Sequence, residues 1–301
     1  MSHSHSHPHN HASGSSWRFS VGIGLNLVIV AGETIAALAG NSTALLADAG
    51  HNLTDVLSLV LAGGAIWLAQ RPANDKRTYG FRRATILAAL ANALLLIIMS
   101  VLLAAECIDH LVSSNRVNEP LVIGIAALAV VVNGATALLF MRGRKQDINL
   151  RGAFLHMLSD AALSAGVILA AVGIMLTGWQ WLDPSMGLII VIVILWSTWS
   201  LLRESFDLSL DAVPPGIDPD AIRDALLEEP KITEVHHLHV WAMSTTEVAL
   251  TAHLVKPDGQ LDDALLSRLE KSLSERFGIR HIALQLEHGG KYEGCPAGTP
   301  G

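Results

Sequence analysis

The sequence predicts a membrane-embedded, all-α bundle of six helices followed by a small α+β domain. Of its 301 residues, 51% are hydrophobic and 16% are charged, whereas an ordinary soluble domain has about 25% charged residues. Six apolar runs are each long enough to cross a bilayer as a helix. After Arg203 the composition turns polar, and residues 207–301 have the length of a small domain.

The chain begins with a polar tail, residues 1–16, in which histidines alternate with Ser, Pro and Asn. We expect this tail to be disordered because it cannot form a core. His-rich tracts bind and collect metal ions. An expression tag is the alternative origin, but the interrupted spacing favours a natural metal-collecting tail.

Residues 17–206 are predicted to form the six transmembrane helices. We place them at Trp17–Leu38, Ala44–Ala69, Arg83–Leu111, Leu121–Met141, Gly152–Leu176 and Pro184–Leu202. The links after the second and fourth helices are rich in Lys and Arg, whereas the links on the other side contain Arg116 alone. Because Lys and Arg concentrate in cytoplasmic loops, we expect both termini in the cytoplasm of a multi-pass protein of the bacterial inner membrane.

Residues 207–301 are predicted to be a cytoplasmic α+β domain with helices on one face of a sheet. Asp218 is expected to cap the first helix. We place the helices at Pro219–Glu229 and Leu261–Phe277, and the strands at Thr233–Trp241, Glu247–Lys256 and His281–Glu287.

One stretch of the second helix carries ionisable groups inside an apolar run. It reads LLADAGHNLTDVL and contains Asp48, His51 and Asp55. His51 and Asp55 are four residues apart, so they share one face of a helix. An Asp near the middle of a membrane helix costs on the order of 3 kcal/mol on insertion scales. Such groups serve an ion path, a proton relay or a buried pair.

The fifth helix repeats the pattern. Its sequence LHMLSDAAL contains His156 and Asp160 at the same spacing. Two imidazoles and two carboxylates that converge would form a four-ligand metal site. The two helices run in opposite directions, an arrangement that recurs in transporters. At about 1.5 Å per residue, however, His51 and His156 would lie at different depths in a flat slab. We therefore expect a water-filled cavity, open to the cytoplasm, that lets Arg151 lie deeper than the lipid boundary.

Glu33 in the first helix and Asp48 in the second are further acidic residues within the apolar runs. They line the ion path or pair structurally, and the sequence does not separate these alternatives.

The four ligands favour Zn²⁺. Two neutral imidazoles and two carboxylates balance its charge, and four N and O donors suit its tetrahedral geometry. Co²⁺ fits nearly as well and Cd²⁺ remains an alternative, whereas Ca²⁺ and Mg²⁺ prefer all-oxygen sites of higher coordination. These ligands bind metal only when deprotonated, so metal–proton exchange is expected. The net charge of −7 argues against nucleic acid as a partner.

The chain resembles the cation diffusion facilitator family of divalent-metal transporters. The resemblance rests on the His tract, LLADAGHNLTD, YGFRR, LHMLSD, the six-helix layout, and VHHLHVW with TAHLV. It implies a homodimeric, proton-coupled exporter of Zn²⁺ with a ferredoxin-like, metallochaperone-like cytoplasmic domain. It carries the transport site onto His51, Asp55, His156 and Asp160. Some relatives have a second site in the link after the second helix, but NDKRTYGF contains no histidine, so we expect that site to be absent.

In the cytoplasmic domain the resemblance implies metal ligands at His236, His253 and Glu287, with His281 less securely placed. Strand alternation conflicts with this set, because it puts His236 on the apolar side and groups His237 and His239 with the others on the open face. A β-bulge would reconcile the two interpretations. For each histidine a surface role is the alternative. Cys295, near the end of the chain, is a candidate soft ligand.

Two other classes of function are weighed against transport. An intramembrane metalloenzyme usually keeps one metal position open for water, whereas four protein ligands fill the site. The His tail and the soluble domain favour a metal sensor or storage protein, but such a protein does not need six transmembrane helices. We therefore expect a transporter rather than an enzyme.

Overall fold

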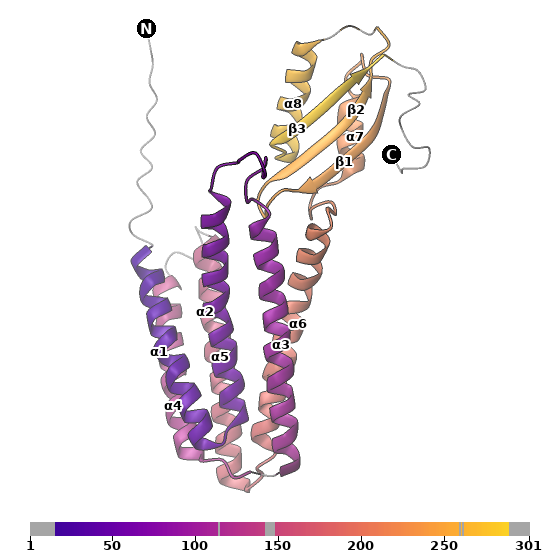
Figure 1. Ribbon diagram of the computed structural model, residues 1–301. Coiled ribbons are helices and arrows are strands. Elements are labelled where there is room, and N and C mark those ends of the chain that lie inside the picture. Colours follow the sequence, from indigo (N-terminus) through magenta and orange to yellow (C-terminus); the bar gives the residue numbers. More distant parts are fainter. Residues whose placement is uncertain (1–15, 114, 142–147, 259, 261, 289–301) are drawn as a thin grey trace, which may run out of the picture. The chain divides into compact units, whose positions relative to one another are not determined.

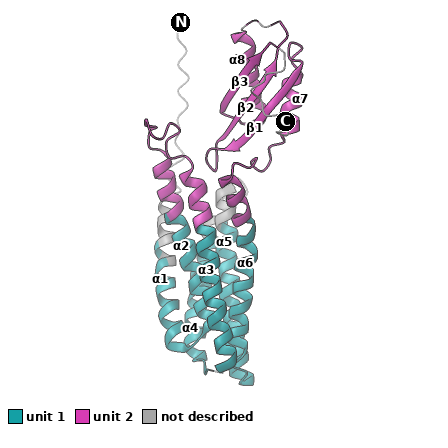
Figure 2. Ribbon diagram, turned by 45° about the vertical axis from the view of Figure 1, so that its right-hand side comes forward, with its two compact units in different colours: residues 1–60, 92–200 teal, residues 61–91, 201–301 magenta. Residues whose placement is uncertain are grey.

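The computed structural model describes residues 16–113, 115–141, 148–258, 260 and 262–288 (Figure 1). The histidines of the tail and Cys295 lie outside the described residues. The chain divides into two compact units, residues 1–60 and 92–200 and residues 61–91 and 201–301 (Figure 2). Each unit has a buried apolar core of its own.

Six long helices agree with the predicted ones to within a few residues at most of their ends. They are α1 (Ser16–Gly40), α2 (Thr43–Ala69), α3 (Ala84–Ser113), α4 (Glu119–Met141), α5 (Ile148–Thr177) and α6 (Leu182–Ser209). The sixth differs most, because it continues beyond Leu202 as a polar helix. Membrane hydropathy marks where a helix leaves the lipid, not where its backbone hydrogen bonding stops.

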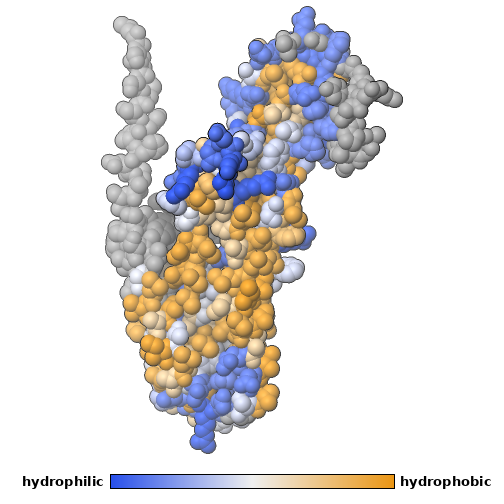
Figure 3. Space-filling view, in the orientation of Figure 1, coloured by the Kyte–Doolittle hydropathy of each residue, from blue (hydrophilic) through white to orange (hydrophobic). Residues whose placement is uncertain are grey.

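The outer faces of these helices are apolar, as lipid contact requires. Five of the described helices are long and apolar enough to cross a membrane. Leu169 is 73% exposed and Trp196 is 82% exposed, which would be unfavourable in water. Apolar side chains cover the helical surface seen in Figure 3. The chain is therefore a multi-pass membrane protein.

The small domain is built on a three-stranded sheet in the order β1-β2-β3. β1 (Glu234–Ala242) and β2 (Val248–Val255) are antiparallel, and β3 (His281–Glu287) is parallel to β2. Helices α7 (Pro219–Leu227) and α8 (Asp263–Phe277) supply buried leucines and isoleucine to one core with the strands. Asp218 caps α7, as predicted, by accepting a hydrogen bond from the amide of Asp220.

A buried carboxylate joins the starts of α2 and α6. Asp183 is 2% exposed. It accepts hydrogen bonds from the Ser42 hydroxyl at 2.5 Å, from the Thr43 amide and hydroxyl at 2.6 and 2.9 Å, and from the Ala44 amide at 3.2 Å. It thus satisfies amide groups that α2 leaves unpaired at its start, and its charge lies at the positive end of that helix.

Replacing Asp183 with Ala should lower the stability of the helical unit. The change leaves two hydroxyls and two amides without their acceptor, each costing about 1–3 kcal/mol when buried. Asp183→Asn keeps one acceptor oxygen and should lose less. The melting temperature of the purified protein in one detergent measures both. Asp109→Ala is the control, because Asp109 is exposed in α3. Equal melting temperatures for Asp183→Ala and Asp109→Ala would contradict the capping role.

Candidate metal centres

Three contacts align α2 and α5 as an antiparallel pair. Along α2, Asp48, His51 and Asp55 meet in turn Ser164, Asp160 and His156 of α5. A step of three or four residues along α2 is matched by a step of four back along α5. Because such steps complete one helical turn, all six side chains lie along a single seam between the two helices.

The four predicted transport residues form an alternating ring. The Nε2 atom of His51 lies 3.8 Å from Asp55 Oδ2 and 3.7 Å from Asp160 Oδ1. The Nε2 atom of His156 lies 3.4 Å from Asp55 Oδ2 and 3.7 Å from Asp160 Oδ2. Each imidazole therefore faces both carboxylates, and each carboxylate faces both imidazoles.

These separations suit a tetrahedral ion. Bonds of about 2.0–2.1 Å to nitrogen and oxygen place the corners of a tetrahedron about 3.3–3.4 Å apart. Four of the six edges, from 3.4 to 3.8 Å, are close to that value, with the two edges at Asp160 running to its two different oxygens. One potential ligand atom from each of His51, Asp55 and Asp160 lies within 4.8 Å of the other two.

Several polar atoms of the ring have no hydrogen-bond partner although they are buried. Among the described residues these include Asp55 Oδ2 and both carboxylate oxygens of Asp160. The Asp160 side chain is fully buried, whereas that of His156 is 41% exposed. Buried carboxylate oxygens without partners are costly, and a bound cation would satisfy them together.

The helices are staggered, which explains how histidines at different distances from their helix ends can meet. Asp55 is 12 residues after Thr43, the first residue of α2, but its partner His156 is 21 residues before Thr177, the last of α5. The difference of nine residues makes α5 extend about 13 Å past the start of α2. The expected cytoplasm-facing cavity stays a prediction.

Glu33 and Asp48 are fully buried beside the ring. Glu33 Oε2 accepts a hydrogen bond from Asn52 at 3.1 Å, and Asp48 Oδ2 accepts one from Ser164 at 2.6 Å. The second oxygen of each carboxylate has no hydrogen-bond partner in the described structure. Both residues thus pair on one side only, and their role in an ion path stays a prediction.

A second cluster lies on the open face of the small sheet. Glu287 Oε2 is 3.1 Å from His236 Nε2, and its Oε1 is 2.8 Å from His253 Nδ1. One potential ligand atom from each of the three side chains lies within 4.8 Å of the other two. A β-bulge, which the sequence allowed but did not require, brings them together, because the four residues of β1 from His236 to His239 oppose only three residues of β2, His253 to Thr251. His237 adopts a left-handed backbone at φ 49° inside this bulge.

His281 does not join that cluster. It pairs with Ala249 at the start of β3, whereas Glu287 pairs with Val255 at the other end. Six residues of strand span about 20 Å. The ring of His281 instead lies 2.5 Å from the Arg82 guanidinium, which can donate to its Nε2.

Sequence reasoning missed Asp183, Asn52 and Ser164. The Asp183–Pro184 pair is a signal for the start of its own helix, α6, but no sequence pattern indicated that Asp183 caps α2. Nothing in the sequence marked Asn52 and Ser164, because only the packing of α1, α2 and α5 makes them partners of Glu33 and Asp48.

Two protein-family models match the chain. One, described as the cation efflux transmembrane domain, matches residues 20–208, and the other, described as the cation efflux protein cytoplasmic domain, matches residues 214–289. The chain belongs to the cation efflux, or cation diffusion facilitator, family. It is a metal efflux transporter with a small cytoplasmic domain.

Curated relatives agree with this assignment. The metal cation efflux system protein CzcD of Cupriavidus metallidurans is 34% identical over 85% of this chain and 81% of its own length. A protein of Bacillus subtilis named as a cadmium, cobalt and zinc/H⁺–K⁺ antiporter is 36% identical over 85% of this chain and 83% of its own length. The zinc transporter ZitB of Escherichia coli is 33% identical over 85% and 82%.

A solved structure also matches part of the chain. It is the metal-bound C-terminal domain of the CzcD transporter, with 29% identity, a TM-score of 0.22, and coverage of 24% of this chain and 99% of that structure. The family and these relatives are transporters, so the metalloenzyme alternative is set aside for this cation efflux protein.

Proposed function

We propose that this transporter exports Zn²⁺ from the cytoplasm in exchange for protons through the ring of His51, Asp55, His156 and Asp160. The observation that carries the proposal is the alternating arrangement of two imidazoles and two carboxylates at 3.4–3.8 Å across one helix pair. Such a set holds one ion with every position filled by protein.

The donor set supports Zn²⁺ as the cargo. Two neutral imidazoles and two carboxylates neutralise a divalent ion, and mixed N and O donors suit Zn²⁺ better than Ca²⁺ or Mg²⁺. Co²⁺ and Cd²⁺ are the closest competitors. Two relatives are named for the same group of ions, one as a zinc transporter and one as an antiporter for cadmium, cobalt and zinc.

Proton exchange follows from the ligands. Imidazole and carboxylate bind metal only when deprotonated, and imidazole takes up a proton most readily near neutral pH. An incoming proton and the outgoing ion therefore compete for the same atoms. The B. subtilis relative is likewise named an antiporter with H⁺.

The distribution of Lys and Arg supports an orientation with both termini in the cytoplasm. The small domain then lies in the cytoplasm of a bacterial inner-membrane protein. There the cluster of His236, His253 and Glu287 binds Zn²⁺ and strengthens a homodimer. Three protein ligands leave one tetrahedral position for a further donor.

A membrane-anchored sensor or storage protein is the second candidate, and the cytoplasmic cluster is the observation that favours it. Flux of Zn²⁺ into sealed vesicles separates the two, because a sensor binds the ion without moving it across the membrane.

Replacing His51 with Asp should keep metal binding but change selectivity. Three carboxylates and one imidazole form a harder, more anionic set that favours Mn²⁺ relative to Zn²⁺. Asp55→Ala removes a ligand and half of the charge balance, so it should abolish transport. Fluxes of Zn²⁺, Cd²⁺, Co²⁺ and Mn²⁺ in vesicles measure both effects.

The control for these variants is His110→Ala. His110 is a histidine of α3 that pairs with Glu106 at 3.4 Å and not with the ring. Membrane insertion is checked for each variant. An unchanged metal profile in His51→Asp, or normal flux in Asp55→Ala, would mean that the ring is not the transport site.

Collapse of the pH gradient should slow Zn²⁺ flux in wild-type vesicles at constant Zn²⁺, because protons replace the ion on the same ligands. The initial rate of Zn²⁺ uptake with and without a protonophore measures this dependence. A rate that is the same in both conditions counts against exchange.

Zn²⁺ should shift the cytoplasmic domain, residues 207–301, from monomer towards dimer. His253→Ala should remove the shift, because it deletes one of three ligands. His239→Ala is the matched control, since His239 pairs with Thr251 further along the sheet. Sedimentation velocity measures the change. A domain that stays monomeric at high concentration with and without Zn²⁺ would contradict Zn²⁺-dependent dimerisation.

A further inference from the structure

The link between α2 and α3 is strongly basic. Residues 70–83 carry one carboxylate, Asp75, and five cations, in a chain whose net charge is −7. The cations are Arg71, Lys76, Arg77, Arg82 and Arg83. Because the link joins the ends of two spanning helices, it must lie at the level of the lipid headgroups.

Part of this charge is left without a carboxylate partner. Arg82 pairs with Glu247 at 2.7 Å, and Arg83 pairs with Asp211. Arg77 lies over the Phe81 ring at 4.5 Å, and within the described structure neither Arg77 nor Lys76 forms an ion pair. The side chains of Lys76 and Arg77 are exposed, so their charge is available to a ligand.

Four of the five cations line a pocket of about 840 Å³, against one carboxylate, Asp211. The orientation of the protein in the membrane explains why basic residues lie on one side of the bilayer. It does not explain why four of them surround one pocket.

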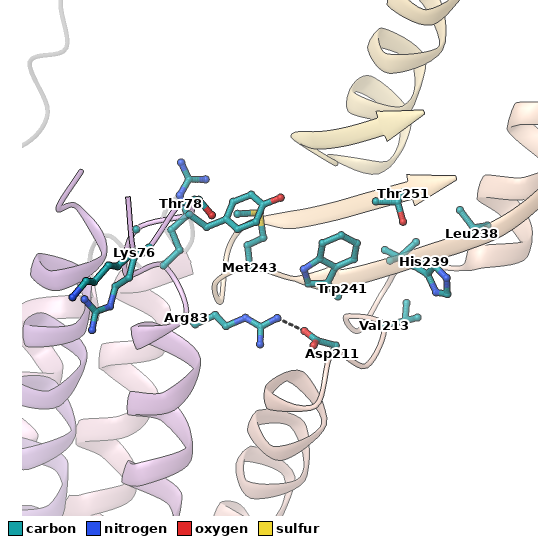
Figure 4. A pocket seen from close by; sticks show the side chains of 15 residues that line it. Lys76, Thr78, Arg83, Asp211, Val213, Leu238, His239, Trp241, Met243 and Thr251 are labelled. Atoms are coloured by element: carbon teal, nitrogen blue, oxygen red, sulfur yellow. Dashed lines mark hydrogen bonds and ion pairs between the residues drawn. The ribbon is translucent and has the colours of Figure 1, made fainter. Parts of the chain in front are cut away.

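The opposite wall of this pocket is mostly apolar. Val213, Leu238, Trp241 and Met243 line it, together with the polar side chains of His239 and Thr251. Figure 4 shows Trp241 facing the space above the Arg83–Asp211 pair, with Lys76 and Thr78 across from it. The pocket is therefore amphiphilic, with cations from the link on one side and apolar side chains on the other.

We infer that this pocket binds the glycerol phosphate group of an anionic phospholipid. Arg and Lys are the usual partners of phosphate oxygens, and basic residues beside transmembrane helices attract anionic lipids. The apolar wall suits the glycerol and the first acyl carbons, which a free anion lacks.

The test uses the full-length protein in nanodiscs that contain equal amounts of phosphatidylcholine and phosphatidylglycerol. Native mass spectrometry then counts the lipids that remain bound after release. The wild type should retain phosphatidylglycerol in preference. Lys76→Gln/Arg77→Gln should reduce this retention about fivefold per lost charge, since one basic residue near a membrane surface contributes about 1 kcal/mol.

Arg203→Gln/Lys271→Gln is the matched control, because it removes two cations whose side chains are 78% and 75% exposed and lie outside the pocket. It should retain phosphatidylglycerol as the wild type does. Equal loss in both double variants would reduce the effect to net charge and overturn the inference. So would a wild type without preference for phosphatidylglycerol.

Competition with soluble glycerol 3-phosphate identifies the source of the phosphate. A lipid that this anion does not displace supports a phospholipid site, which is the expected result. Displacement of the lipid by the soluble anion at equal concentration would overturn the lipid assignment and leave a site for free phosphate esters. The Lys76→Gln/Arg77→Gln variant should bind neither ligand well.

Discussion

The structure depends on one constraint: six ionisable side chains inside an apolar helix bundle need polar partners within that bundle. Glu33, Asp48, Asp55 and Asp160 supply four carboxylates, and His51 and His156 supply two imidazoles. An isolated charge at this depth costs on the order of 3 kcal/mol or more. The antiparallel pairing of α2 and α5 meets the constraint, because the same register that brings His51 to Asp160 also brings Asp55 to His156 and Asp48 to Ser164.

The sequence could predict which residues converge but not how their helices slide to meet. The His-x-x-x-Asp spacing selects one face of α2 and one of α5, and the contacts of His51 with Asp160 and of His156 with Asp55 lie between these two faces. The depth of each histidine in the membrane could not be predicted from the sequence, because hydropathy does not show how far one helix is shifted along its neighbour. The same limit explains α6, whose apolar run stops at Leu202 while the helix continues to Ser209.

In the cytoplasmic domain, a single inserted residue determines whether His236 lies on the same face of the sheet as the other candidate metal ligands. Alternation along β1 puts His236 on the wrong side of the sheet, and the bulge before His239 reverses that parity. The sequence admitted this bulge but did not require it. His281 illustrates the opposite case, since its place at the far end of β3 follows from strand length alone and was available from the predicted bounds. Local patterns fix the faces of elements, whereas register needs the partner strand.

The burial of the ring also bears on why the proposed exchange should involve protons. Asp160 is fully buried, and both of its oxygens lack a hydrogen-bond partner in the described structure. On the proposed mechanism, departure of a divalent ion would leave two carboxylates facing each other in an apolar bundle, which is unfavourable. Protons that arrive on the same four side chains restore the balance without any additional group. A more exposed ring would let water screen the charges, and the empty site would then have no need of protons. On that mechanism, the burial of Asp160 is the reason that protons must accompany the release of the ion.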